Sequence, residues 1–143
     1  MKWVDMVIRD SRFRFSLLML LVALHSFLVG AALMFLPVDI FHRLFDYQPI
    51  TERFFTVQAG VFHVVLGIGY CLAAVKLERF PGLIILSITA KFIATIFLLT
   101  YSIFSAFIPV AFLSGIGDGL MGMAMLWAFL SYKRQGVIRE NVQ

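Results

Sequence analysis

The sequence contains few charged residues and almost no cysteine. Only 14% of its 143 residues are charged, whereas a typical soluble domain contains about 25%. The single cysteine, Cys71, excludes an internal disulfide and gives no information about the cellular compartment. Paired-cysteine metal motifs and phosphate-binding glycine loops are also absent from the sequence. Together with a hydrophobic content of 62%, the scarcity of charge predicts an integral membrane protein without a dedicated metal site.

Four long apolar runs carry this hydrophobicity, at residues 15–36, 55–75, 82–107 and 110–132. Each has at least the roughly 20 residues that an α-helix needs to cross about 30 Å of hydrocarbon. The first run is also longer than the apolar part of a cleavable signal peptide. Short connections after the second and third runs require antiparallel neighbours. We therefore predict an all-α fold, a transmembrane four-helix bundle that forms a single domain over residues 1–143.

The charged residues outside these runs predict an orientation. Basic residues gather before the first run, in the second connection and after the last run: Lys2, Arg9, Arg12, Arg14, Lys76, Arg79, Lys133, Arg134 and Arg139. By the positive-inside rule both termini are cytoplasmic, and in a bacterium the protein would lie in the cytoplasmic (inner) membrane. The same bias accounts for the net charge of +4, so no nucleic-acid partner is needed to explain it.

Two further segments are expected at the membrane surfaces. Residues 1–14 combine apolar and basic side chains, which is typical of a short amphipathic helix on the cytoplasmic face. Residues 37–54, which read PVDIFHRLFDYQPITERF, predict an outer-face loop that contains a short interfacial helix.

Four ionisable residues lie inside the apolar runs, one in each. They are His25, His63, Lys91 and Asp118. At 1.5 Å per residue, each lies about 12–15 Å from the nearer end of its run. An ionisable residue at this depth costs several kcal/mol unless it is paired or neutralised. Four residues at one level predict a shared interior site.

The helical periodicity supports this prediction. Small or polar residues share a helical face with three of the four: Gly60, Gly67 and Tyr70 with His63; Ser87, Thr95 and Ser102 with Lys91; Ser114, Gly115 and Gly122 with Asp118. Such stripes allow transmembrane helices to approach closely, and Gly115 and Gly119 have the GxxxG spacing. We expect Lys91 to reach Asp118, so that both stay charged. The candidate polar site is Lys91, Asp118, His63, His25 and Tyr70.

Each of these residues also has a structural interpretation. A pair of Lys91 and Asp118 can serve only to fix the helix register, and the two residues can also face different neighbours. His63 can donate to a backbone carbonyl or bond to Tyr70, as buried histidines commonly do. The methionines of the fourth run are expected to pack or to face lipid.

Three of the runs resemble the DoxX-like family of small membrane proteins. The similar stretches are QAGVFHVVLGIGYCLAA, ITAKFIATIFLL, and GIGDGLMGMAMLWAFL, which supply Lys91 and the Gly117–Asp118 pair. The resemblance implies a four-helix bundle associated with quinone or thiol redox systems, and similar folds include sterol-binding isomerases. Because Cys71 stands alone, dithiol chemistry does not carry over to this chain.

Three functions are compatible with these residues. In the first, the polar band binds the head of a quinone, a sterol or another lipid-phase small molecule, or the chain is an accessory component of a larger membrane complex or a homo-oligomer. In the second, His25 and His63 bind one b-type haem and the protein carries electrons. In the third, His63 or Asp118 acts as acid or base in a membrane isomerase-type enzyme. The sequence leaves open whether the protein is an enzyme.

Overall fold

The structure is a computed structural model that describes residues 11–37, 40 and 53–140, with the backbone alone for 135–140. It contains four helices: α2 (Ser11–Phe35), α4 (Phe54–Val75), α5 (Pro81–Phe104) and α6 (Pro109–Glu140). By length and composition, all four are able to cross a membrane. The described part of the chain contains no strand. The interfacial helix expected within 37–54 and most of the amphipathic segment 1–14 lie outside the described residues.

The helices differ from the apolar runs mainly at their ends. Helix α2 begins at Ser11 and α6 extends to Glu140, because a helical backbone can continue beyond the apolar part that crosses a membrane. Helix α5 ends at Phe104 rather than at residue 107. Pro109, the first residue of α6, disfavours helical geometry at the residue before it, so a short turn separates the two helices.

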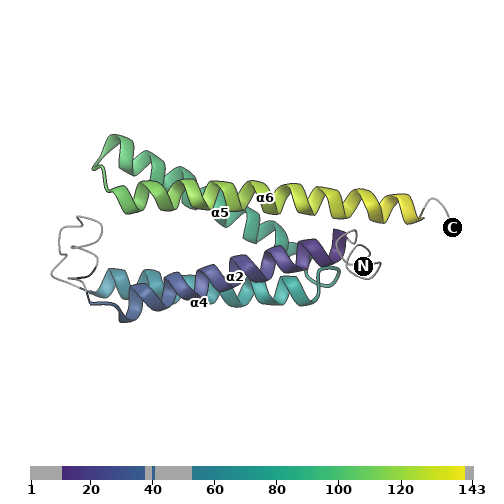
Figure 1. Ribbon diagram of the computed structural model, residues 1–143, viewed down its shortest axis with the longest axis horizontal. Coiled ribbons are helices and arrows are strands. Elements are labelled where there is room, and N and C mark those ends of the chain that lie inside the picture. Colours follow the sequence, from purple (N-terminus) through teal and green to yellow (C-terminus); the bar gives the residue numbers. More distant parts are fainter. Residues whose placement is uncertain (1–10, 38–39, 41–52, 141–143) are drawn as a thin grey trace, which may run out of the picture.

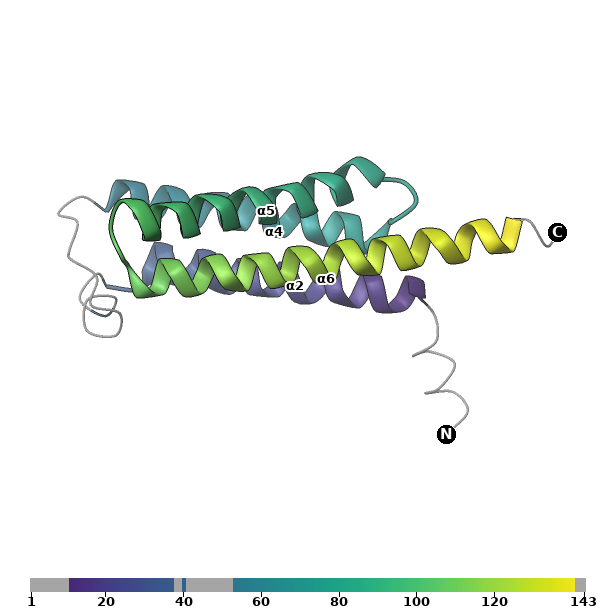
Figure 2. The same ribbon diagram turned by 90° about the horizontal axis from the view of Figure 1, so that it is seen from above.

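The bundle is built from two closely packed pairs of helices. Helix α2 packs on α4 and α5 packs on α6, and smaller contacts of α2 with α6 and of α4 with α5 close the ring (Figures 1 and 2). The start of α2 and the end of α6 lie at the same end of the bundle. We call the half that contains Ser11, Val75 and Pro81 the terminal half. The half that contains Phe35, Phe54, Phe104 and Pro109 is the opposite half.

Glycines set the distance between α2 and α4. A Cβ atom added to Gly30 would lie 2.9 Å from the carbonyl oxygen of Gly60, and one added to Gly60 would lie 2.8 Å from the carbonyl oxygen of Gly30. Gly67 lies against the ring of Phe27, with 2.8 Å between its added Cβ and the nearest ring carbon. The absence of side chains at these positions therefore lets the two backbones approach closely.

Glycines also form the contact between α5 and α6. A Cβ atom added to Gly115 would lie 3.0 Å from the Leu99 side chain. One added to Gly119 would lie 3.2 Å from Thr95, and one added to Gly122 would lie 3.3 Å from Lys91. The predicted use of Gly115 and Gly119 as a packing surface is confirmed by these contacts. The space around Gly117 is open: an added Cβ would meet nothing within 4 Å.

The buried apolar side chains gather in the terminal half. Phe15, Met19, Tyr70, Ile84 and Met125 are the largest of them, and each is almost fully buried. Large apolar side chains along all four helices face outward instead, as expected for surfaces in contact with lipid: Leu28, Phe62, Ile96 and Leu120 are examples. The side chains that a membrane would surround and those that fill the core are thus clearly separated.

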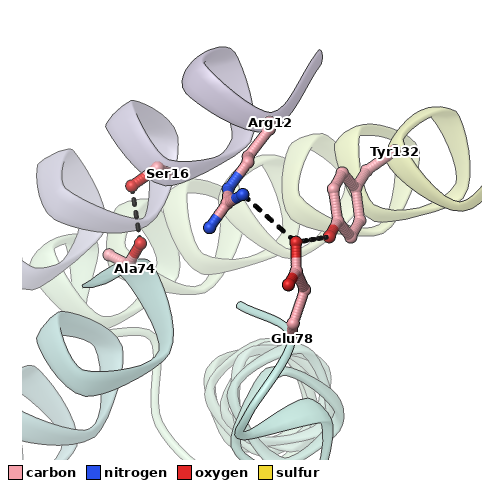
Figure 3. Close-up of polar contacts among 5 residues, drawn as sticks. All are labelled: Arg12, Ser16, Ala74, Glu78 and Tyr132. Carbon is pink, nitrogen blue, oxygen red and sulfur yellow. Dashed lines mark hydrogen bonds and ion pairs between the residues drawn. The ribbon is translucent and has the colours of Figure 1, made fainter. Parts of the chain in front are cut away.

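Polar contacts tie the helices together at the terminal end (Figure 3). Ser16 Oγ donates to the carbonyl oxygen of Ala74 at 2.6 Å, which joins α2 to α4. Glu78, in the connection between α4 and α5, pairs with Arg12 at 3.2 Å and accepts a hydrogen bond from the Tyr132 hydroxyl at 3.4 Å. Glu78 thereby links α2 and α6 to the α4–α5 connection.

Candidate intramembrane polar site

A buried ion pair joins α5 and α6 near the middle of the bundle. Lys91 Nζ donates to Asp118 Oδ1 at 2.5 Å, and the two side chains are 4% and 11% exposed. Gly122 lies opposite the start of the lysine side chain and leaves room for it. The expected contact between Lys91 and Asp118 is therefore present, and the small residues of α6 allow it.

The hydroxyl groups on the same face of α5 are satisfied within that helix. Thr95 Oγ1 donates to the carbonyl oxygen of Lys91 at 2.8 Å, and Ser87 Oγ donates to that of Leu83 at 2.6 Å. Such bonds to the preceding turn are common for Ser and Thr in apolar helices. Asp118 is consequently the one hydrogen-bond partner of Lys91 Nζ among the described residues. Two of the three N–H groups of the ammonium have no partner there.

Tyr70 brings α4 to the ion pair. Its side chain is 1% exposed, and its ring centroid lies 6.0 Å from Lys91 Nζ. At this distance the negative face of the aromatic ring attracts an ammonium group. Tyr70 therefore adds a contact from α4 to the ion pair between α5 and α6.

The two histidines lie within electrostatic range of the ion pair, but in different environments. The charges of Lys91 and Asp118 act on both His25 and His63. His63 is half-buried, and its Nδ1 is buried without a hydrogen-bond partner in the part of the chain that the structure describes. The expected bond from His63 to a carbonyl or to Tyr70 is thus not formed at that nitrogen. His25 is exposed.

The register of α2 and α6 explains why His25 and Asp118 lie at one level. The ring of Phe15 lies 5.9 Å from that of Phe129 and 6.1 Å from that of Tyr132, which fixes the antiparallel pairing of the two helices. His25 follows Phe15 along α2, and Asp118 precedes Phe129 along α6, by nearly the same number of residues. Each therefore lies about 15 Å from the aromatic contact.

Ser26, next to His25 on α2, was not among the residues predicted for the site. It is fully buried, and its Oγ has no partner among the described residues. A serine in a helix normally donates to its own preceding turn, so sequence alone gives no signal that this hydroxyl is free. Ser102 Oγ is also buried without a described partner. It lies about 16 Å farther along α5 than Lys91 and belongs to a different level.

The packing does not accommodate a haem between the two histidine-bearing helices. His63 Cβ lies 3.3 Å from the position of a Cβ atom added to Gly30, so α2 and α4 are in direct contact at this level. A haem ligated from both sides needs a wide space between its two axial ligands. The described residues also contain no group of three His, Cys, Asp or Glu side chains that is able to hold a metal ion.

Fold and site together define an all-α protein with four candidate membrane spans and a buried polar cluster at their centre. No family model, curated protein or solved structure matches this chain. The chemistry of the cluster is therefore the basis for assigning a function.

Proposed function

We propose that this chain is a DoxX-like integral membrane protein whose interior site binds the polar head of a lipid-phase small molecule. A quinone is the first candidate for that ligand and a sterol the second. The observation that carries the proposal is the buried Lys91 ammonium, which has one partner, Asp118, among the described residues.

The ammonium group sets the chemistry of the ligand. A buried donor without a partner costs about 1–3 kcal/mol, and more when it is charged. A carbonyl oxygen placed beside Lys91 Nζ would accept one of the remaining N–H groups. Asp118 would hold the ammonium group in position, and the Tyr70 ring would lie beside a flat ligand. A quinone combines a flat ring with carbonyl oxygens.

The second candidate ligand follows from Ser26 and His63. Ser26 Oγ and His63 Nδ1 are buried polar atoms without a described partner. A hydroxyl group both donates and accepts, so a sterol hydroxyl would satisfy either atom. The mid-span level of the site favours a ligand dissolved in the bilayer over one dissolved in water. This role agrees with the resemblance of the second, third and fourth spans to the DoxX-like family.

The membrane orientation is part of the same proposal. With both termini cytoplasmic, the terminal half faces the cytoplasm and the opposite half faces the outer side. In a bacterium the protein would lie in the inner membrane, where it would act alone, as a homo-oligomer or as an accessory component of a larger complex. The exposed apolar surfaces of all four helices offer room for partners as well as for lipid.

Equilibrium binding to the purified protein in lipid nanodiscs tests the proposal. The probes are radiolabelled decyl-benzoquinone and cholesterol. Lys91→Met should weaken binding of the preferred probe about tenfold or more, since it removes a charged hydrogen-bond donor. Lys133→Met is the matched control, because Lys133 is exposed near the end of α6; it should bind as the unchanged protein does.

A double variant separates binding from a purely structural role. Lys91→Met alone leaves a buried, unpaired carboxylate, which costs about 3–5 kcal/mol of stability. Lys91→Met combined with Asp118→Leu removes both charges and should recover the unfolding midpoint without recovering binding. Wild-type affinity in this double variant would show that the pair only fixes the helix register. A wild-type protein that binds neither probe would contradict the proposed function.

A further inference from the structure

We infer that the ligand reaches the site sideways from the lipid, by passing between α2 and α6, with His25 at the entrance. The inference rests on the proposed function and defines its ligand class more closely. The ligand would be an amphiphile with a hydrogen-bonding head that lies at Lys91 and an apolar tail that stays between the two helices.

The position of His25 on α2 gives the first argument. Phe27, two residues away, packs on Gly67 of α4. Two residues correspond to about 200° around a helix, so His25 lies on the flank of α2 that faces away from α4. The other neighbour of α2 in the ring is α6. His25 is ten residues along α2 from Phe15, which contacts α6, and this spacing corresponds to about 80° around the helix. His25 therefore lies at the edge of the side of α2 that faces α6, at the level of Asp118, whose charge acts on it.

The shape of that interface gives the second argument. The aromatic and cation–π contacts between α2 and α6 lie in the terminal half: Phe15 with Phe129 and Tyr132, and Arg14 over the Trp127 ring at 5.9 Å. Beyond these contacts the two helix axes diverge toward the opposite half (Figure 1). The α2–α4 and α5–α6 interfaces, in contrast, are held by glycine contacts that reach into the opposite half.

The chemistry of an exposed histidine gives the third argument. An imidazole that faces hydrocarbon at mid-span is costly, because it loses hydrogen bonds to water. The exposed side chains next to it on α2, Leu24 and Leu28, are apolar as expected for lipid contact. His25 departs from that pattern at the one level where the buried ion pair lies. A polar head that moves from lipid to Lys91 would find hydrogen-bonding groups first at His25 and then at Ser26.

Photolabelling tests the route directly. The probe is a benzoquinone with a decyl tail that ends in a diazirine, incubated with the full protein in nanodiscs and irradiated. Peptide mass spectrometry should find the label on α2 and α6, at residues that border their interface in the opposite half. An excess of unlabelled decyl-benzoquinone should reduce this label about tenfold, as expected for a saturable site. A competed label on α4 and α5 would overturn the inference.

Binding kinetics provide an independent test with a matched control. His25→Trp places a bulky side chain at the entrance and should slow both association and dissociation of decyl-benzoquinone about tenfold. Leu24→Trp places the same side chain on the lipid-facing side of α2 and should leave both rates unchanged. If His25→Trp leaves association unchanged, or speeds dissociation alone, His25 does not border the route.

The two hypotheses fail in different ways. If the wild-type protein shows no competed label, or if the Lys91→Met and Asp118→Leu double variant is labelled equally, the proposed binding site itself is wrong. If the competed label depends on Lys91 but lies on α4 and α5, the site stands and only the lateral route between α2 and α6 is wrong.

Discussion

The two halves of this bundle are held together in different ways. In the terminal half, large side chains such as Phe15, Met19 and Ile84 fill the centre, and Glu78 and Ser16 add polar contacts between helices. In the opposite half, the buried positions are small or polar among the described residues: Ser26, Gly30, Gly60, Ser102, Gly115 and Asp118. The ion pair of Lys91 and Asp118 lies where the two kinds of packing meet.

This difference suits a protein that holds a ligand in its interior. A filled core fixes the four helices at one end, because well-packed side chains resist displacement. At the other end each helix pair stays closed through its glycines, while no large apolar side chain of the described residues is fully buried there.

The largest effect is expected from a cavity in the terminal half. Phe15→Ala removes a fully buried ring that contacts Phe129 and Tyr132, and should lower the free energy of unfolding by about 3–5 kcal/mol. Leu28→Ala, on the exposed side of the same helix, should cost much less. Thermal unfolding in detergent measures both variants. Equal losses would show that the terminal half is not the main support of the fold.

A second comparison concerns the glycine contacts of the opposite half. Gly30→Ala places a Cβ atom 2.9 Å from the Gly60 carbonyl oxygen and should destabilise the protein by about 1–3 kcal/mol. Gly69→Ala meets nothing within 4 Å and should stabilise α4 by up to about 1 kcal/mol, because alanine favours a helix. The two variants should therefore shift the unfolding midpoint in opposite directions. If both variants shifted the unfolding midpoint in the same direction, this would argue against close contact of α2 with α4.

Serine-to-alanine substitutions compare the polar contacts of the two halves. Ser16→Ala removes the hydrogen bond to Ala74 and should cost about 1 kcal/mol. Ser102→Ala removes a buried hydroxyl that has no partner in the described part of the chain, so it should leave stability unchanged or slightly higher. Chemical denaturation of both variants measures the change in the free energy of unfolding that each substitution causes. A clear loss of stability in Ser102→Ala would mean that this hydroxyl has a hydrogen-bond partner in the membrane.

The smallest effect is expected at the exposed end of the terminal half. Glu78→Gln weakens the ion pair with Arg12. The Arg12 side chain in this pair is 56% exposed and the Glu78 side chain is 67% exposed. Exposed ion pairs contribute about 0–1 kcal/mol, so the loss should not exceed this range. It should also decrease at high salt, because ions screen exposed charges. The free energy of unfolding measured at low and at high salt tests both the size of the loss and its dependence on salt. A loss above about 1 kcal/mol would contradict the expectation that exposed contacts contribute least to stability.

Much of the fold could be predicted from local features of the sequence. The four apolar runs correspond to α2, α4, α5 and α6, with differences at the ends where a helix continues into charged residues or stops before a proline. The meeting of Lys91 with Asp118 was also predictable, since depth and helical phase depend only on position along each helix. The same periodicity placed Tyr70 on the helical face of His63 and Gly67, but it did not indicate the contact of the Tyr70 ring with the Lys91 ammonium.

Other parts of the site depend on contacts that no single helix contains. Ser26 differs from an ordinary helical serine only because its hydroxyl lacks a partner within the described chain. The contact of Glu78 with Arg12 and Tyr132 joins segments far apart in the sequence, and neither spacing nor periodicity indicates it. His25 and His63 both belonged to the predicted site, but the sequence did not indicate that His25 is exposed and His63 half-buried.

The sequence alone determined that the chain has four apolar helices and that their ionisable residues lie at one level, because hydrophobicity and helical rise are properties of each segment. The packing of the helices against one another set which helices form close pairs, where the large side chains gather and how α2 diverges from α6. Those features depend on the fit of side chains from different helices. A glycine allows close approach, but which neighbour it meets is settled only when the helices pack together.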